Sequence, residues 1–262
     1  MRFRPCIDIH NGKVKQIVGG SLKDEGDRAA ENFVSEQGGD YYAEFYKKDG
    51  LKGGHIILLN PESSDYYEAT KAQALKALRA WKGGFQIGGG IQEKNAEEFL
   101  DAGASHVIVT SYVFRDGQIS YERLERMKAA VGKEHLVLDL SCRKRDGAYY
   151  IVTDRWQKFT DVKVTAELLM QLQASCDEFL IHAVDVEGKA SGIEEELAAL
   201  LGTMKDIPIT YAGGVSSFED LKKLKTLGNG HVDVTIGSAL DLFGGPLSYQ
   251  KVLDYIKFNN QL

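Results

Sequence analysis

Cysteine is scarce in this chain of 262 residues, and the three that are present, Cys6, Cys142 and Cys176, are far apart. An odd number of widely spaced cysteines indicates neither a disulfide framework nor a zinc-ligand pair. Carboxylates and histidines do not cluster at metal-ligand spacing either, so the sequence predicts no metal site. Residues 88–90 are glycines but lack the Gly-x-Gly-x-x-Gly spacing of a dinucleotide fingerprint. We expect a cytoplasmic protein of a reducing compartment.

Long apolar runs and a surplus of positive charge are also missing. No segment approaches the ~18 apolar residues that a membrane-spanning helix needs. The net charge is −6, whereas nucleic-acid-binding proteins normally show a basic stripe with interleaved aromatic residues. We therefore expect neither membrane nor nucleic acid as a partner. We also expect a monomer. An anionic small molecule fits, because backbone N–H groups at helix N-termini hold phosphate without adding formal charge.

What the chain does contain is a regular alternation of short apolar runs and longer helical patterns, which is typical of βα units around a parallel sheet. Helix patterns cover residues 94–102, 121–131, 165–174, 193–201 and 218–227. Eight predicted strands in one chain of this size match the count of a closed (β/α)8 TIM barrel. We predict a single α/β domain, residues 1–262, with strands at 3–9, 55–60, 85–88, 106–110, 135–140, 179–184, 207–212 and 232–236.

The chain also repeats itself. Asp8 ends one apolar run and Asp139 another, an interval of 139 − 8 = 131 residues, which is half of 262. The segment 85–92 is echoed by 209–216, and the segment 104–111 by 231–238. Two duplicated half-barrels, about 1–132 and 133–262, are the simplest account.

One stretch, residues 19–54, is longer than a strand-to-helix connection needs. It is rich in Gly, Asp, Glu and Lys, and we expect a helix over about 35–48 within an otherwise mobile loop. A tolerated surface insertion is one interpretation. A lid over the site is the other, because the loop follows the first strand at the end of the barrel where active sites lie.

Glycine pairs follow the third and seventh predicted strands, and small or hydroxyl residues follow the fourth and eighth. Glycine at a strand-to-helix junction lets backbone N–H groups approach an anion, whose charge the helix dipole favours. A single pair is better explained as a tight turn, but two pairs in equivalent positions predict two phosphate sites. The first would use Gly89, Gly90, Thr110 and Ser111, and the second Gly213, Gly214, Gly237 and Ser238.

Asp8 and Asp139 end strands one and five, which lie opposite each other in a ring of eight. Two carboxylates that face a substrate from opposite sides suit acid-base chemistry, in which one takes a proton and the other donates one. For a single aspartate the alternative is a turn or helix cap. The internal repeat favours the catalytic interpretation for both.

Other candidates are weaker. His182 lies near the end of strand six and is a candidate catalytic hydrogen-bonding partner. Trp156 could stack on a flat heterocycle or be a core aromatic. Arg143 could bind a phosphate or carboxamide, or belong to a solvated basic loop. We interpret His10 and His55 as structural, and Asp185 and Glu187 as solvated or turn-forming loop carboxylates.

Six motifs in order resemble one family, phosphoribosylformimino-aminoimidazole carboxamide ribotide isomerase of histidine biosynthesis. They are CIDIHNGKV at 6–14, QIGGGI at 86–91, VLDL at 137–140, DVEG at 185–188, YAGGV at 211–215 and IGSAL at 236–240. Through the fourth motif, the resemblance adds Gly188 to the expected substrate-binding residues. His182 stands where many family members have threonine, and the long first loop resembles that of the eukaryotic forms.

The resemblance implies an Amadori rearrangement of an aminoaldose to an aminoketose, on a small-molecule substrate that carries two phosphates. By matching position, Asp8 would be the general base that removes the C2 proton, and Asp139 the general acid that protonates the ring oxygen. No cofactor is implied. Two alternatives stay open. The sister cyclase shares both aspartates and both phosphate sites but needs ammonia from a glutaminase, of which this sequence has no segment, and a noncatalytic phosphosugar-binding barrel would need neither aspartate.

Overall fold

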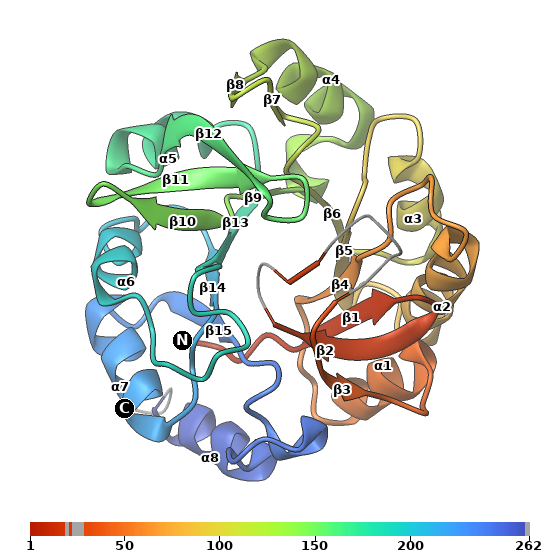
Figure 1. Ribbon diagram of the computed structural model, residues 1–262, viewed down its shortest axis with the longest axis vertical. Helices are drawn as coiled ribbons and strands as arrows, with labels where there is room; N and C mark the ends of the chain where they lie inside the picture. The colour runs from red at the N-terminus through yellow and green to blue at the C-terminus, as the bar shows by residue number, and fades with distance from the viewer. Residues whose placement is uncertain (19–20, 23–28, 260–262) are drawn as a thin grey trace.

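Eight parallel strands form a ring at the centre of the protein (Figure 1). The computed structural model describes residues 1–18, 21–22 and 29–259. In order around the ring the strands are β1 (Cys6–His10), β4 (Gly54–Leu58), β5 (Phe85–Gly88), β6 (His106–Val109), β9 (Leu136–Asp139), β13 (Glu178–His182), β14 (Ile209–Ala212) and β15 (Val232–Thr235). All eight predicted strands are present.

The ring is closed by the residues just before β1. The backbone N–H of Arg4 donates to the carbonyl of Val234 at 2.8 Å, and the N–H of Val234 donates to the carbonyl of Arg2 at 2.9 Å. Phe3 and Val234 form a parallel bridge at the same seam. The predicted TIM barrel is therefore confirmed.

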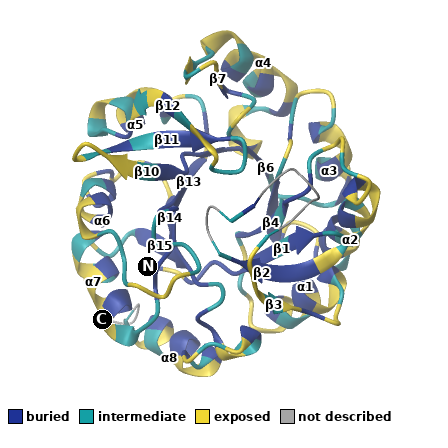
Figure 2. Ribbon diagram, viewed as in Figure 1, coloured by how far each residue is buried: buried dark blue, intermediate teal, exposed yellow. Residues whose placement is uncertain are grey.

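Helices surround the barrel and turn their apolar sides toward it (Figure 2). Ser120, Thr165 and Ser217 cap the N-termini of α4, α5 and α7 with their side chains. The predicted bounds of α4 and α7 are correct at both ends. The helices are α1 (Gly39–Lys48), α2 (Tyr67–Ala80), α3 (Ala96–Ala102), α4 (Tyr121–Val131), α5 (Ala166–Leu172), α6 (Glu195–Leu201), α7 (Phe218–Leu227) and α8 (Tyr249–Asn259), with short 3₁₀ turns η1 (Lys133–His135) and η2 (Asp241–Phe243). Among the helices described, none is long and apolar enough to cross a membrane.

Among the described residues, seven further strands were not predicted. They are β2 (Lys13–Ile17) and β3 (Glu31–Val34), which extend β1 in antiparallel fashion, the small hairpin β7 (Phe114–Arg115) and β8 (Gln118–Ile119), and a separate sheet of β10 (Cys142–Arg145), β11 (Ala148–Thr153) and β12 (Lys158–Lys163). A sequence signal for three of the turns was present. Asn11-Gly12 joins β1 to β2, Asp116-Gly117 joins β7 to β8, and Asp146-Gly147 joins β10 to β11. Both residues of each turn have positive φ, the two-residue hairpin signature.

The long first connection is more ordered than predicted. Within 19–54, residues 31–34 form β3 because β2 offers an open edge, and the predicted helix at 35–48 begins later, at Gly39. Residues 19–20 and 23–28 lie outside the described residues. The lid function stays a prediction.

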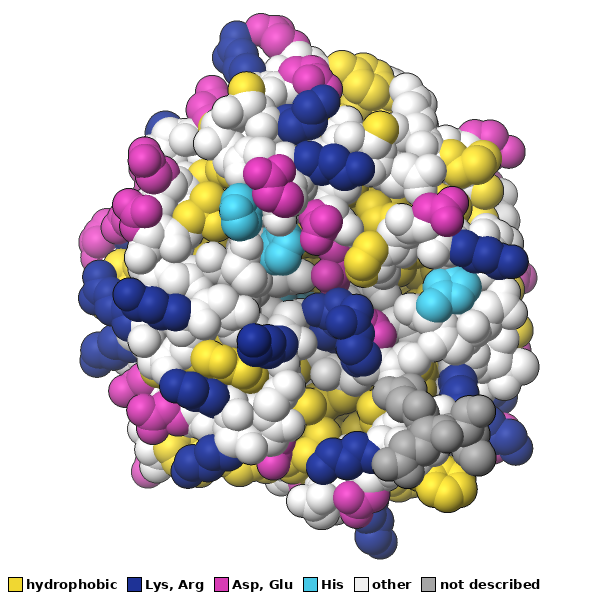
Figure 3. Space-filling model, turned by 180° about the vertical axis from the view of Figure 1, so that it is seen from behind, with side chains coloured by type: hydrophobic (Ala, Val, Ile, Leu, Met, Phe, Trp, Pro, Cys, Tyr) yellow, Lys and Arg dark blue, Asp and Glu magenta, His cyan; other side chains and the backbone are white. Residues whose placement is uncertain are grey.

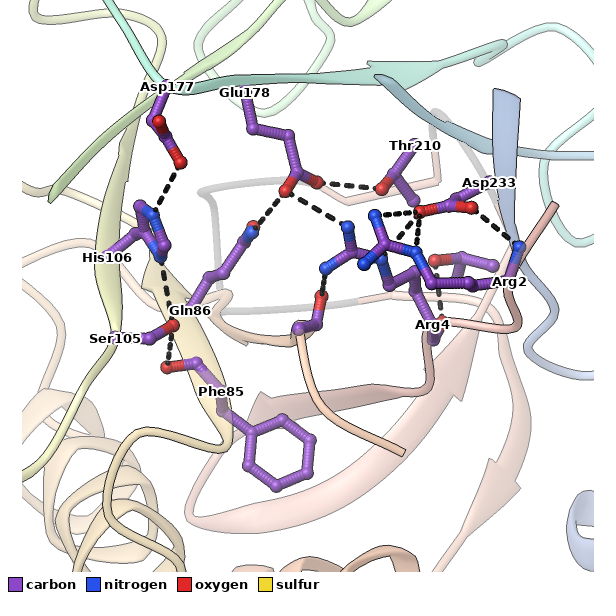
Figure 4. A network of polar contacts seen from close by, with 12 residues as sticks. Arg2, Arg4, Phe85, Gln86, Ser105, His106, Asp177, Glu178, Thr210 and Asp233 are labelled. Atoms are coloured by element: carbon purple, nitrogen blue, oxygen red, sulfur yellow. Dashed lines mark hydrogen bonds and ion pairs between the residues drawn. The ribbon is translucent and has the colours of Figure 1, made fainter. Parts of the chain in front are cut away.

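The N-terminal end of the barrel interior is filled by a buried polar network (Figure 4). Arg4 pairs with Asp233 at 2.9 Å and with Glu178 at 3.4 Å, and it donates to the carbonyl of Gly53 at 3.1 Å. Gln86 and Thr210 donate to the same glutamate at 2.9 and 2.7 Å. Because buried charges are tolerated only when paired and hydrogen-bonded, this network both fills and fixes the closed end.

Seen from the side opposite to Figure 1, the surface carries acidic and basic side chains interspersed (Figure 3).

Candidate active site

Two adjoining cavities lie at the carboxyl ends of the barrel strands, where TIM-barrel active sites are found. The larger measures about 150 Å³ and the smaller about 30 Å³. Asp8, His182 and Glu187 line both cavities. These three ionisable groups therefore stand at the junction between the two spaces.

The larger cavity brings together the predicted residues of the first half. Asp139 also lines the larger cavity. An apolar wall completes its lining and consists of Ile17, Leu22, Leu59 and Trp156, which pack as one cluster. The smaller cavity brings together the predicted residues of the second half. The first set is Gly89, Gly90, Thr110 and Ser111, and the second is Gly188, Gly213, Gly214, Gly237 and Ser238.

The two glycine pairs have the same backbone shape. Gly89 and Gly90 have φ of 97° and 73°, and Gly213 and Gly214 have φ of 120° and 76°. A Cβ on Gly213 would lie 2.7 Å from the carbonyl oxygen of Ala183, and a Cβ on Gly89 would collide with that of Leu58. Glycine is therefore required by the turn at these positions, whether or not an anion binds there.

The turn between the second glycine pair and α7 does not offer the N–H groups of Ser216 and Ser217 to a ligand. Asp220 Oδ2 accepts from the backbone N–H of Ser216 and Ser217, both at 3.0 Å, and completes a capping box with the Ser217 side chain. An anion at this turn would have to be held by the glycine loop and by Ser238 instead.

Asp8 is held in surroundings that favour its protonated form. Burial and the negative charge of Glu187 raise the pKa of Asp8 to about 7, against the opposing influence of His182. The pKa of Glu187 is itself raised by burial. Two carboxyl groups at the cavity junction thus resist being ionised together.

Asp139 is held in the opposite way. Its Oδ1 accepts from the backbone N–H of Ser141 at 2.8 Å and from the Ser141 hydroxyl at 2.7 Å, and it lies 3.5 Å from His182 Nδ1. Burial alone would raise the pKa of Asp139, but the charge and hydrogen bond of His182 and the hydroxyls of Ser141 and Thr110 together lower it. Of the two aspartates, Asp139 is the one whose surroundings favour the ionised form.

His182 links the two carboxylates. Burial opposes its charge, but Asp139, Glu187 and Asp8 together raise the pKa of His182. The neighbouring His55 ring lies 5.7 Å away, edge to face, and burial together with the charge of His182 lowers the pKa of His55 to about 3. One imidazole is thus stabilised as a cation and the other as a neutral ring.

Glu187 was expected to be a solvated or turn-forming loop carboxylate. It lies in a turn, and it also reaches the cavities, which was not expected. The connection after β13 turns its carboxyl group into the mouth, where it lines both cavities and is half-buried. The available signal was its place five residues after His182, beyond the carboxyl end of a barrel strand. Polar residues in that position face the active site of this fold.

Arg143 is not brought to either cavity. Its Nε contacts Asp185 Oδ1 at 2.8 Å, and its guanidinium lies over the ring of Phe159 at 5.4 Å. Arg155 lines the larger cavity instead. The basic residue at the mouth thus comes from the β11–β12 turn, which the sequence did not reveal as a hairpin.

Trp156 reaches the site from that same turn. Asp154, Arg155 and Trp156 all have positive φ, at 51°, 53° and 68°. The indole Nε1 donates to the Ser141 hydroxyl at 3.0 Å, and its ring lies 5.6 Å from that of His182. The structure therefore places Trp156 in the cavity wall. Trp156 is therefore not a residue of the main core, which was one of the two predicted possibilities.

Within the described part of the chain, no group of three or more His, Cys, Asp or Glu side chains could hold a metal ion. At the mouth, Asp8 and Glu187 interact as like charges, and Asp139 and His182 form a pair with 3.5 Å between Oδ1 and Nδ1.

A TIM barrel with ionisable groups gathered at its carboxyl mouth defines the class of barrel enzymes. Residues 2–245 match the model of the family described as histidine biosynthesis protein, and the chain belongs to that family. The resemblance drawn from the six motifs is thereby confirmed.

Three relatives carry the name 1-(5-phosphoribosyl)-5-((5-phosphoribosylamino)methylideneamino) imidazole-4-carboxamide isomerase. A chloroplastic protein of Medicago truncatula is 54% identical over 265 residues, which cover 100% of this chain and 82% of the relative. A protein of Neurospora crassa is 47% identical over 93% of both chains. A protein of Yarrowia lipolytica is 45% identical over 100% of this chain and 98% of the relative.

Proposed function

We propose that this protein is an isomerase of histidine biosynthesis that converts an aminoaldose to an aminoketose by an Amadori rearrangement. Its substrate would be N′-(5′-phosphoribosyl)formimino-5-aminoimidazole-4-carboxamide ribonucleotide, which carries a phosphate at each end. The observation that carries the proposal is the pair of glycine-lined cavities that meet at Asp8, with Asp139 in the wall of the larger one. The names of the relatives support it.

The two cavities fit the two ends of such a molecule. In the proposal, one phosphate lies against Gly89, Gly90, Thr110 and Ser111, and the other against Gly213, Gly214, Gly237 and Ser238. Trp156 and the apolar wall give the larger cavity a surface for the flat heterocycle. The reacting sugar would then lie at the junction, beside the ionisable groups.

Asp8 is the proposed general base. When the ring opens, the bond from C1 to the ring oxygen breaks, its electron pair goes to the oxygen, and the nitrogen lone pair forms a protonated Schiff base. Asp8 then takes the C2 proton, and the electrons left behind neutralise the Schiff base and give an enolamine that tautomerises to the ketose. A pKa of about 7 suits a base that must be partly ionised at neutral pH and still hold a proton firmly.

Asp139 is the proposed general acid, and His182 is the source of its proton. An ionised carboxylate cannot donate, so the proton that reaches the ring oxygen is the one that Asp139 and His182 hold between them. Strongly interacting groups titrate as a pair rather than separately. In the proposal, Asp139 and His182 therefore act together as one acid, and Asp139 is the member that transfers the proton to the substrate.

A turnover assay tests the proposal. The isomerase should convert the bisphosphate substrate without any nitrogen donor, whereas the sister cyclase would need ammonia. A noncatalytic phosphosugar-binding barrel would bind the substrate and leave it unchanged. Absence of turnover with saturating substrate and tight binding would overturn the proposal in favour of that last alternative.

We further propose that the protein acts in the cytoplasm as a monomer. Cys6, Cys142 and Cys176 are buried free thiols, which suits a reducing compartment. Because the Medicago truncatula relative is named chloroplastic, cell fractionation with a plastid marker is the appropriate test of location. Sedimentation at micromolar concentration tests the oligomeric state.

A further inference from the structure

Ser141 has a more specific position than its place between two strands requires. It follows Asp139 by two residues, lies between β9 and β10, and is completely buried at 0% exposure. Its carbonyl also accepts from the backbone N–H of Val152 on β11 at 2.8 Å. The main chain that carries the hydroxyl is thus held by the barrel on one side and by the outer sheet on the other.

The directions of the hydrogen bonds at Ser141 follow from the chemistry of its partners. An indole N–H can only donate, so Trp156 Nε1 must donate to the Ser141 oxygen, at 3.0 Å. The single hydroxyl proton of Ser141 is then directed to Asp139 Oδ1 at 2.7 Å, the shortest contact it makes. His182 Nδ1 approaches the same hydroxyl at 3.3 Å. The chain of donors therefore runs from Trp156 through Ser141 to Asp139.

The indole is itself fixed at a defined point. The backbone N–H of Asp154 donates to the Ser111 hydroxyl at 3.0 Å, which ties the β11–β12 turn to the first glycine cradle. The three consecutive residues at positive φ show that this turn is held in a conformation that side-chain-bearing residues rarely adopt. Contacts at both ends of the turn offset that cost.

We propose that Ser141 is a positioning residue, which orients the carboxylate of Asp139 and links that orientation to the seating of Trp156 in the cavity wall. The proposal rests on the proposed function, in which Asp139 exchanges a proton with the substrate. Ser141 does not line either cavity and so acts only through the side chains that it contacts, Asp139, Trp156 and His182. A ligand that packs against the indole of Trp156 would strengthen its hydrogen bond to Ser141. Because hydrogen bonds in such chains reinforce one another, the bond from Ser141 that aligns the Asp139 carboxylate would be strengthened too.

The test uses Ser141→Ala, Trp156→Phe and the double variant, with Thr160→Val as a matched control. Thr160 is a buried hydroxyl of the same outer sheet that donates to the carbonyl of Ile151 at 2.8 Å and does not contact Asp139. We expect Ser141→Ala to lower kcat about ten- to a hundredfold, as small displacements of a catalytic group do, with KM changed less than about threefold. Thr160→Val should keep the kcat of the wild type.

The double variant separates positioning from general damage. Trp156→Phe keeps an aromatic ring in the cavity wall and removes the N–H donor. The part of its effect on kcat that acts through Ser141 should therefore disappear when Ser141 is already alanine. Independent, additive effects of the two substitutions would overturn the proposal. So would a wild-type kcat in Ser141→Ala.

A second readout does not depend on turnover. Carbon-13 NMR of the Asp139 carboxyl group should show it titrating at a higher pH in Ser141→Ala than in the wild type, because a donor to the ionised form is lost. The other groups that face it are His182 from β13, His55 from β4, and the hydroxyl of Thr110, with the Cys142 thiol beyond. An unchanged titration would contradict the positioning role.

The two proposals fail in different ways. If Asp139→Asn turns over at the wild-type rate, the catalytic role of Asp139 is wrong, and the NMR titration of Ser141→Ala still decides whether Ser141 controls the carboxylate. If Asp139→Asn is inactive while Ser141→Ala has normal kcat and a normal titration, the catalytic role stands and the positioning role is wrong.

Discussion

Asp8 and Asp139 occupy matching places in the two halves of the barrel, and their surroundings are opposite. Asp8 faces another carboxyl group, Glu187, and the pKa of Asp8 is raised to about 7. Asp139 accepts two hydrogen bonds from Ser141 and lies beside the imidazole of His182, which together with Thr110 lower its pKa. The difference shows that residues added around a repeated framework, rather than the framework itself, can shift the pKa values of two equivalent aspartates in opposite directions.

The cavities differ in the same sense. The first half carries the larger space, walled by Trp156 and aliphatic side chains, and the second carries a small space lined mainly by glycine loops and small residues. The outer sheet β10–β12 supplies Trp156 to the larger cavity, and β2 supplies Ile17. The unpredicted strands thus account for much of the asymmetry between the halves.

The largest expected effect comes from neutralising each aspartate in turn. Asp8→Asn and Asp139→Asn should each lower kcat at least about 10²-fold, the typical loss when acid-base catalysis is removed. Binding of a bisphosphate ligand should be largely kept, because the glycine cradles are untouched. Steady-state kinetics and calorimetry check the two halves of this expectation, and a wild-type rate in either variant would remove that residue from the mechanism.

Replacing His182 should affect the Asp139 side most. His182→Gln removes the charge that holds Asp139 ionised and the proton that the pair supplies, so kcat should fall by about tenfold or more. The acid limb of the kcat/KM profile, which reports Asp8 in the free enzyme, should persist and move to higher pH, because the charge of His182 that opposes the raised pKa of Asp8 is lost. Loss of that limb would show that the two sides are not separable.

The glycine pairs offer a matched comparison of the cradles. Gly90→Ala and Gly214→Ala place a Cβ at nearly the same φ, 73° and 76°, and so bear a similar strain of about 1–2 kcal/mol. The Cβ at 90 meets open space, whereas the Cβ at 214 collides with the carbonyl of Gly192. Gly214→Ala should therefore lose roughly 1–3 kcal/mol more in free energy of unfolding, as overpacked sites do. Urea unfolding of both variants measures the difference, and equal losses would contradict the tighter packing of the second cradle.

The smallest effect is a shift in pH dependence. As a base, Asp8 must be ionised, so kcat/KM of the wild type should fall as pH drops below about 7 and level off above it. Glu187→Gln removes the like charge that helps raise the pKa of Asp8, so the same limb should move to lower pH. A limb that stays in place would mean that burial alone sets the pKa of Asp8.

The sequence predicted the barrel well because its strands are buried on both sides and end in small or polar residues. All eight strand positions and both bounds of α4 and α7 follow from that pattern. It did not predict β2, β3 or β10–β12, since short strands with charged residues such as Lys13 and Arg145 carry no clear apolar alternation. Only their Asn-Gly and Asp-Gly turns were informative.

The sequence predicted which residues belong to the site better than it predicted how the loops place them. The glycine pairs and the two aspartates come together because the ends of barrel strands always meet at the mouth. The positions of Glu187, Ser141 and Arg155 depend on how loops fold back over that mouth, which periodicity does not encode. Arg143, a candidate by residue type, pairs with Asp185 outside the cavities for the same reason.

The most direct test of the separate roles of the two aspartates is a carbon-13 NMR titration of their carboxyl groups, with Asp8→Asn and Asp139→Asn used to assign the two signals. We predict that the Asp8 signal titrates near pH 7 and the Asp139 signal below the ordinary range of an aspartate. Two signals that titrate together, or in the reverse order, would contradict this division of roles.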